Sequence, residues 1–213
     1  MLKLKRYQER VLDELADYLR LAVEKDNANT AFYERVYRRY QPVAGLPGLP
    51  YVCIRLPTGG GKTLVACHSV GVAAQNYLQT EHPLVLWLVP TKTIREQTLR
   101  ALRDRRHPYR QVLDADFEGR VTVMDVRDAL FVSRSALERG TCIVVSTLAA
   151  LRREETEGLK VYKSNGALMD HFSGLPQQVE ALLDKVDGEI IYSLANLMRL
   201  HRPLVVVDEA HNA

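Results

Sequence analysis

The stretch Leu56-Pro57-Thr58-Gly59-Gly60-Gly61-Lys62-Thr63 decides the fold that this sequence predicts. Residues 51–56, which lead into it, are mostly apolar strand formers, and the residues from Lys62 onward place apolar side chains at helical spacing. The sequence therefore predicts a strand, a glycine loop and a helix in succession. Glycines let a loop turn tightly, so that its N–H groups and those of the following helix N-terminus face phosphate oxygens.

A nucleoside triphosphate with Mg²⁺ is the ligand that this pattern favours. The Lys62 ammonium can reach the β- and γ-phosphates, and the Thr63 hydroxyl can bind Mg²⁺. Gly59, Gly60 and Gly61 are the expected cradle, and Thr58 is expected to bind the nucleotide beside them. The general pattern G-x-x-x-x-G-K-[ST] has glycine where this chain has Leu56, so the match is to a Pro-Thr-Gly-x-Gly-Lys-Thr variant. A glycine turn without a ligand is the weaker interpretation.

A second informative segment is Val205-Val206-Val207-Asp208-Glu209-Ala210-His211. Residues 204–207 are four consecutive branched aliphatics, a pattern typical of a parallel strand covered on both faces. Asp208 would follow at the carboxyl edge of the sheet, where a carboxylate can hold Mg²⁺. Glu209 is placed to orient and deprotonate an attacking water. Taken alone, the segment could also be an exposed acidic turn.

Together the two segments resemble motifs I and II of the first motor domain of superfamily 2 helicases and translocases, in the Asp-Glu-Ala-His (DEAD/DEAH box) class. Within that class the chain is most similar to the ATPase (Res) subunit of type III restriction enzymes and related bacterial defence helicases. The phosphate loop, the Asp-Glu-Ala-His-Asn-Ala ending and the long segment before it carry this similarity, and residues 152–200 match least well. The resemblance implies ATP and Mg²⁺ as cofactors and nucleic acid, DNA rather than RNA, as the track.

Two strand-to-helix junctions extend the resemblance. Residues 89–97 resemble motif Ia, which contacts the nucleic-acid backbone, with Thr91, Lys92 and Thr93 offering hydroxyls, N–H groups and a charge. Thr147 lies in a segment that resembles a later motif of the same kind. Helix capping by Thr93 in the first junction, or by Ser146 or Thr147 in the second, is the alternative.

Two further residues take their roles from the resemblance. Gln8 resembles the upstream glutamine that reads the adenine edge, because an amide donates and accepts at once, and Tyr7 would pack on the base. The alternative is an exposed glutamine on an amphipathic helix. His211 couples the nucleotide site to the neighbouring domain in the family, with a polar surface histidine as the alternative.

Alternating strands and helices predict a doubly wound α/β fold with a mainly parallel sheet, that is, a P-loop NTPase (RecA-like) domain. Residues 1–50 are expected to be an N-terminal helical segment with a Pro/Gly linker. Residues 51–213 are expected to be the ATP-binding domain, with an insertion at about 152–200 and an end just after motif II. The expected strands are 51–56, 84–89, 121–124, 142–146 and 204–207, and the expected helices are 7–25, 32–40, 62–77, 93–103, one from about 148, 177–186 and 189–200.

Composition adds little to this interpretation. The formal net charge of +3 is too small to establish a nucleic-acid partner. The arginines between Arg95 and Arg110 could flank a nucleic-acid track or form a solvated helix face. Cys53, Cys67 and Cys142 lack metal-ligand spacing and suit small buried side chains in a reducing, cytoplasmic compartment. No signal peptide or membrane-spanning run is found, so no membrane partner is expected.

These observations predict an ATP-driven motor that translocates on nucleic acid or separates its strands, in a restriction or phage-defence role. The resemblance implies a second motor domain in the same chain and a modification or specificity subunit as partner. Because the second domain supplies arginine fingers worth ~10³–10⁵ in rate, residues 1–213 alone are expected to be nearly inactive. A nucleotide-dependent switch or scaffold without helicase activity is the alternative. A P-loop kinase fits less well, since no lid or acceptor site is found.

Overall fold

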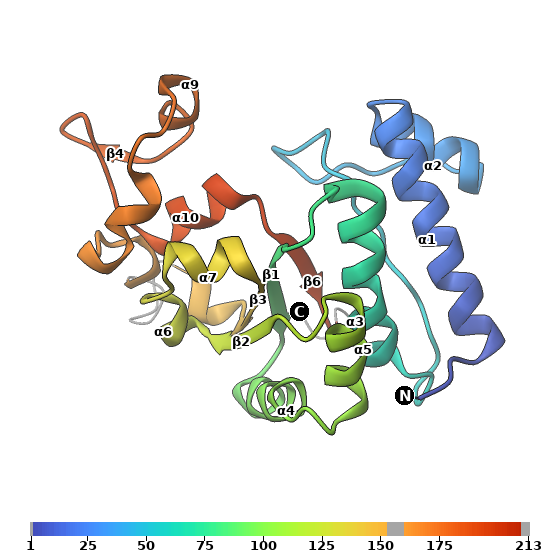
Figure 1. Ribbon diagram of the computed structural model, residues 1–213. Coiled ribbons are helices and arrows are strands. Elements are labelled where there is room, and N and C mark those ends of the chain that lie inside the picture. The colour runs from blue at the N-terminus through green and yellow to red at the C-terminus, as the bar shows by residue number, and fades with distance from the viewer. Residues whose placement is uncertain (1, 153–159, 210–213) are drawn as a thin grey trace. The chain divides into compact units, whose positions relative to one another are not determined.

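The structure is a computed structural model that describes residues 2–152 and 160–209. The chain forms two compact units, Met1–Glu81 and His82–Ala213 (Figure 1). The phosphate loop lies in the first unit and the acidic segment in the second. The units divide later in the chain than residue 50, and the domain boundary expected there stays a prediction.

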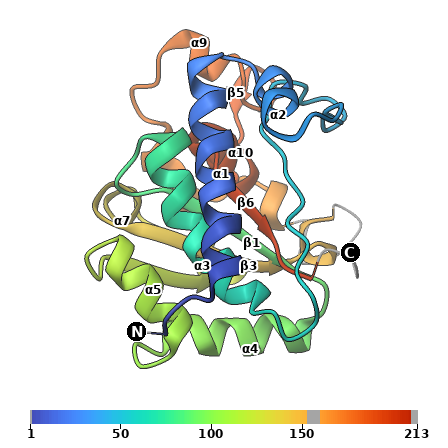
Figure 2. The ribbon, with the colours of Figure 1, turned by 90° about the vertical axis from the view of Figure 1, so that its right-hand side faces the viewer.

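The first unit is helical. It contains α1 (Arg6–Glu24), α2 (Ala28–Val36) and α3 (Lys62–Ala73), which continues into a π-helical turn, η1 (Ala74–Leu78). α1 packs against both α2 and α3 (Figures 1 and 2). The buried residues of α1 recur at the spacing of one helical face, as an amphipathic helix requires; they are Gln8, Leu12, Tyr18, Leu19 and Ala22. The predicted first helix is therefore confirmed, shifted by one residue at each end.

The strand predicted at 51–56 is wrong. The segment has no regular secondary structure, and none of the described strands pairs with it. Exposed and half-buried residues alternate along it, and Pro50 and Pro57 bound it. An apolar run becomes a strand only where a neighbouring edge takes up its N–H and C=O groups. Local composition therefore favours an extended segment, but it does not show whether a neighbouring strand pairs with it.

The second unit is built on a four-stranded parallel sheet in the order β2-β3-β1-β6. In register, Leu88 lies beside Ser146 on one side and Val207 on the other. β1, β3 and β6 therefore end at nearly the same level, at one carboxyl edge. The strands are β1 (Leu84–Val89), β2 (Val121–Asp125), β3 (Thr141–Thr147) and β6 (Leu204–Val207).

Helices cover both faces of this sheet, which confirms the doubly wound α/β class. Alternate β1 residues, such as Leu86 and Leu88, belong to an apolar cluster that includes Leu197. Leu102 and Leu113 are fully buried outside that cluster and belong to the opposite face. α4 (Lys92–Arg103) and α5 (Pro108–Asp116) supply this opposite layer, and the first layer is supplied by α6 (Val126–Ala129), α7 (Arg134–Arg139), η3 (Gly166–Phe172) and α10 (Leu194–His201).

The edge strand β6 departs from expectation. Val205 and Val207 are 49% and 39% exposed, so this strand is not covered on both faces as predicted. A run of four aliphatic residues suits a central strand, but composition does not distinguish it from an edge strand, and β6 lies at the end of the strand order.

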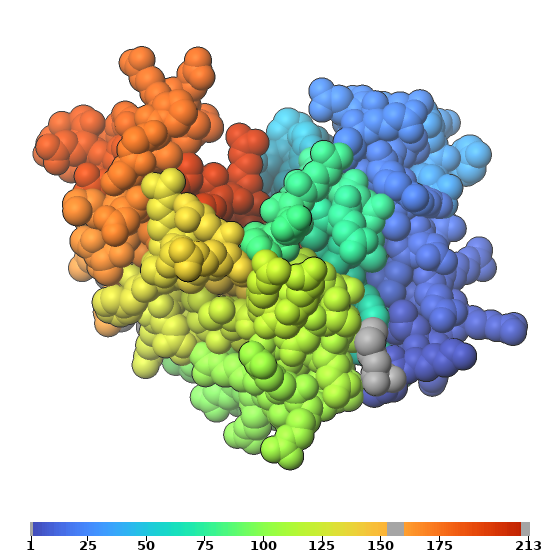
Figure 3. Space-filling view, viewed as in Figure 1, coloured from blue at the N-terminus to red at the C-terminus, as the bar shows by residue number. Residues whose placement is uncertain are grey.

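The segment before β6 differs most from the predicted helices. It holds a short α9 (Gln177–Glu180) and a hairpin of β4 (Lys185–Val186) and β5 (Glu189–Ile190), which protrude from the second unit (Figure 3). The turn residues Asp187 and Gly188 both have positive φ, as a two-residue hairpin requires. The Asn196 amide donates to the carbonyls of Asp184 and Ile191, which fixes the hairpin on α10. Ahead of it, the helix expected from about 148 is only a 3₁₀ turn, η2 (Ala149–Leu151).

The structure bears on what composition predicts for the cysteines and for membrane-spanning helices. Cys67 and Cys142 are buried, and burial raises the pKa of the Cys142 thiol to about 11, but Cys53 is exposed. Two of the three cysteines therefore behave as small buried side chains. None of the described helices is both long enough and apolar enough to span a membrane.

Candidate functional site

The phosphate loop is a tight turn that runs directly into α3. The Gly60 N–H donates to the Pro57 carbonyl at 2.9 Å and closes the turn. Gly61 is the N-cap residue of α3, with φ 76° and ψ 38° in the left-handed region. A residue with a β-carbon adopts this conformation only with strain, so glycine is needed at the helix start. Thr58 and Gly59 are exposed at the tip of the turn.

Steric room also restricts the loop to glycine at two positions. A Cβ added to Gly60 would lie 2.8 Å from the Pro57 carbonyl oxygen. A Cβ added to Gly61 would lie 2.6 Å from Nε2 of Gln8. Both distances are shorter than contacts that real Cβ atoms make. The loop is therefore a close-packed backbone surface, as a cradle for phosphate oxygens requires.

Lys62 and Thr63 follow as the first two residues of α3 and are half-buried. The first N–H groups of a helix lack intrahelical acceptors, and the aligned peptide dipoles place partial positive charge there. An ammonium and a hydroxyl at that end suit a polyphosphate and its metal ion. The structure thus places the predicted phosphate and metal side chains at a helix N-terminus, and their roles stay predictions.

Gln8 and Tyr7 make contacts with the loop that the sequence did not predict. The Gln8 side chain is buried, and its Nε2 donates to the Gly60 carbonyl at 2.8 Å. The Tyr7 hydroxyl donates to the same carbonyl at 3.0 Å. The alternative of an exposed glutamine is wrong, and adenine reading by Gln8 stays a prediction. No local sequence pattern signals these contacts, because Tyr7 and Gln8 lie 53 and 52 positions from Gly60.

In the second unit, Asp208 directly follows β6. Its N–H donates to the Leu88 carbonyl at 2.9 Å, which is the last hydrogen bond of the ladder between β6 and β1. The residue is 7% exposed, and its carboxylate accepts from the Glu209 N–H at 3.0 Å. Glu209 has φ 55°, so the chain turns sharply there. The two carboxylates therefore sit at a strand end and a turn, while Ala210 and His211 lie outside the described residues.

The same carboxyl edge carries the predicted nucleic-acid residues. Thr91, Lys92 and Thr93 follow β1 and are exposed, and Thr147 ends β3 and is buried. Because β1 lies between β3 and β6, these residues and Asp208 share one edge of the sheet. That edge is where ligands bind in open α/β sheets.

Two of the threonines at this edge of the sheet cap turns of the chain. The N-cap of α4 is Thr91 rather than Thr93, and the Thr91 hydroxyl accepts from the Ile94 N–H at 3.2 Å. The Thr147 hydroxyl accepts from the Ala150 N–H at 3.2 Å. Both hydroxyls therefore cap turns; the alternative interpretation held this for Thr147, but it placed the first cap at Thr93. Contacts from these residues to a nucleic-acid backbone stay predictions.

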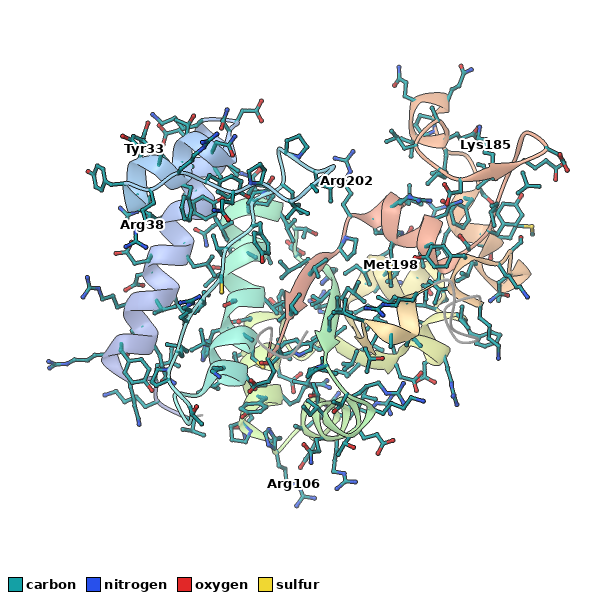
Figure 4. The ribbon with its side chains drawn as sticks, turned by 180° about the vertical axis from the view of Figure 1, so that it is seen from behind. Tyr33, Arg38, Arg106, Lys185, Met198 and Arg202 are labelled. Carbon is teal, nitrogen blue, oxygen red and sulfur yellow. The ribbon has the colours of Figure 1, made fainter. Side chains whose placement is uncertain are left out.

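The arginines after Arg95 divide into two kinds. Arg106 points outward from the connection between α4 and α5 (Figure 4). Arg110 is only 5% exposed, and its guanidinium donates to Asp114 at 2.7 Å and to the Leu102 and Val121 carbonyls at 3.1 and 2.7 Å. Arg110 therefore joins α4, α5 and β2 from inside and is not available to a nucleic-acid track.

This arrangement predicts a large stability difference between two neighbouring arginines. Arg110→Ala leaves the Asp114 carboxylate and two buried carbonyls without their donor, so we expect the free energy of unfolding to fall by about 3 kcal/mol. Arg106→Ala, on the exposed connection, should change it by less than ~0.5 kcal/mol. Urea denaturation followed by circular dichroism measures both. Equal midpoints for the two variants would contradict the structural role of Arg110.

A glycine phosphate loop ahead of a helix, together with an acidic strand end on a covered parallel sheet, defines the class of P-loop nucleoside triphosphatase domains. A family model described as "Type III restriction enzyme, res subunit" matches residues 1–213. The chain belongs to this family of first motor domains of superfamily 2 helicases, which confirms the resemblance seen in the sequence. Searches among curated proteins and among solved structures returned no match.

Proposed function

We propose that this chain binds ATP with Mg²⁺ and that the intact protein uses ATP hydrolysis to translocate on nucleic acid or separate its strands, with DNA as the track. The family supports a helicase-type ATPase motor domain. The observation that carries the proposal is the turn from Pro57 to Gly61, which leads into the N-terminus of α3 with a left-handed glycine as its cap. Few ligands other than phosphate groups suit such a cradle.

The side chains present fit Mg²⁺. A Thr63 hydroxyl and an Asp208 carboxylate are the hard oxygen donors that Mg²⁺ prefers, and phosphates and waters complete such sites. When bound, Mg²⁺ supplies positive charge that neutralises the phosphate oxygens.

The remaining roles fall to this chain's own residues. Lys62 holds a terminal phosphate oxygen by charge, and Glu209 orients the attacking water and accepts its proton. Thr91, Lys92, Thr93 and Thr147 contact the nucleic-acid backbone, and adenine reading is the role that the family resemblance implies for Gln8. His211 couples the nucleotide to a second motor domain of the same chain. A modification or specificity subunit and a role in restriction or phage defence, in the cytoplasm, complete the proposal.

The decisive test is ATP hydrolysis by the full-length protein with duplex DNA, single-stranded DNA or RNA. We expect DNA to stimulate turnover, and Glu209→Gln to abolish the stimulated rate while leaving ATP binding in place, because the amide cannot accept the proton. Residues 1–213 alone should bind ATP and turn it over very slowly, since arginine fingers are worth ~10³–10⁵ in rate.

Each outcome has a distinct meaning. Stimulation by RNA alone would correct the track, and stimulation that survives Glu209→Gln would remove Glu209 from its role. Tight ATP binding without stimulation by any nucleic acid would favour a nucleotide-dependent switch or scaffold over a motor.

A further inference from the structure

Two side chains at the start of α1 converge on a single backbone oxygen of the phosphate loop. Tyr7 Oη and Gln8 Nε2 both donate to the Gly60 carbonyl, at 3.0 and 2.8 Å. α1 and α3 begin at the same end of the first unit, which brings these residues together across a long sequence separation (Figure 2). A carbonyl oxygen has two lone pairs, so both donors can be accommodated at once.

The orientation of the Gln8 amide follows from its two partners. Its Oε1 accepts from the Lys5 N–H at 2.9 Å, and its Nε2 faces the Gly60 carbonyl. A flipped amide would place oxygen against oxygen at Gly60 and nitrogen against an N–H at Lys5. The amide is therefore fixed as a donor toward the loop, in a side chain only 4% exposed.

Holding this carbonyl also orients the next N–H group. In a trans peptide the C=O of one residue and the N–H of the next point in opposite directions, and the described chain contains no cis peptide. With the Gly60 oxygen held toward Tyr7 and Gln8, the Gly61 N–H points away from α1. Within the described part of the chain this N–H donates to no acceptor. It is thus a donor held ready for an external acceptor at the start of α3.

We propose that Tyr7 and Gln8 are positioning residues that hold the Gly60–Gly61 peptide so that the Gly61 N–H can bind a phosphate oxygen. This inference rests on the proposed nucleotide function, but it assigns the two residues to the phosphates rather than to the base. The hydrogen bonds from Tyr7 and Gln8 are already made to the Gly60 carbonyl of the phosphate loop. The chemical group recognised with their help is therefore the polyphosphate, whatever base it carries.

Inorganic tripolyphosphate separates this role from base reading, because it has phosphates and no base. In the full-length protein with Mg²⁺, we expect Gln8→Glu to weaken tripolyphosphate binding roughly tenfold and Tyr7→Phe roughly threefold. Each variant should weaken ATP and GTP by the same factor as tripolyphosphate, so that the ratio of ATP to GTP affinity stays that of the wild type. Isothermal titration calorimetry measures all three ligands.

Matched controls lie in the same unit. Tyr33→Phe and Gln75→Glu make the same chemical changes at exposed positions and should leave all three affinities unchanged. Urea midpoints of all four variants, compared with the wild type, report whether folding has been affected. Tyr7→Phe removes one oxygen atom from a side chain that is 39% exposed, so it keeps the test valid even if Gln8→Glu folds poorly.

The outcomes distinguish phosphate positioning from adenine reading by Tyr7 and Gln8. Equal losses for tripolyphosphate and both nucleotides support the positioning role. Losses confined to ATP would overturn it in favour of adenine reading, and unchanged affinities in folded variants would overturn it outright. A wild-type protein that binds neither ATP nor tripolyphosphate would instead refute the proposed function itself.

Discussion

Replacing Lys62 by alanine is expected to lower nucleic-acid-stimulated ATP hydrolysis by the full-length protein roughly 10²–10³-fold. Lys62 is the first residue of α3, directly after the left-handed Gly61 cap. Its charge adds to the positive end of the helix dipole at the place where the proposed function puts the terminal phosphates. Negative charge spreads over the transferred phosphoryl oxygens in the transition state, so loss of this ammonium affects the rate more than folding.

The measurement is steady-state turnover at saturating ATP, with ATP binding measured separately. Lys25→Ala is the matched control, because Lys25 lies in the same unit in an ion pair with Glu34 and outside the phosphate loop. We expect it to keep the wild-type rate. Turnover by Lys62→Ala within a few-fold of wild type would show that this loop does not hold the reacting phosphates.

Gly61→Ala is expected to weaken ATP binding roughly a hundredfold, through two separate effects. The first is backbone strain, because φ at Gly61 is 76° and alanine adopts this region at a cost of roughly 1 kcal/mol or more. The second is steric, because the new Cβ would lie 2.6 Å from Nε2 of Gln8. The end of the Gln8 side chain can move aside, but it then loses its hydrogen bonds to Lys5 and Gly60, which costs roughly 1–3 kcal/mol.

The chain offers controls that separate the two effects. Gly59 has a similar φ of 72°, but its added Cβ would meet nothing within 4 Å, so Gly59→Ala tests backbone strain in the loop alone. Gly45→Ala, at φ 78° and also without a close neighbour, tests the same strain outside the loop. The double variant Gly61→Ala/Gln8→Ala should bind ATP more tightly than Gly61→Ala, because the contact is gone. Equal ATP affinities for Gly61→Ala and Gly59→Ala would contradict the steric explanation.

The sequence predicted the bounds of those sheet strands whose ends are marked by prolines. The bounds of β1 and β6 agree with the prediction, because Pro83 and Pro90 flank the first and Pro203 precedes the second. Residues 51–56 are also mostly apolar but lack a partner strand in the described structure. The hairpin of β4 and β5 was missed because helical spacing over short windows outweighed the turn signal of Asp187 and Gly188. Pairing is a long-range property, whereas composition is local.

The candidate site also contains parts that local sequence predicts and parts that depend on long-range contacts. Gly61, Lys62 and Thr63 could be placed from spacing alone, because a loop and the helix after it are contiguous in the chain. The Tyr7 contact with Gly60 joins residues 53 positions apart, and no local pattern encodes it. The structural role of Arg110 could not be predicted for a related reason. The sequence shows that the segment is basic, but it does not show which acceptors will bind one of its arginines in the interior. The sequence thus identified the chemistry, and the structure identified what orients it.

The last hydrogen bond of the β1–β6 ladder separates two adjacent carboxylates by the structure that carries them. The Asp208 backbone is hydrogen-bonded to Leu88 and so belongs to the edge of the sheet. Glu209 lies one residue beyond that bond, with φ 55°, in a turn whose dihedral angles are not those of a strand. The end of the β6 ladder therefore marks the point where the sheet stops defining the backbone: the carboxylate proposed to hold Mg²⁺ is carried by the sheet, and the one proposed to act on water is carried by a turn.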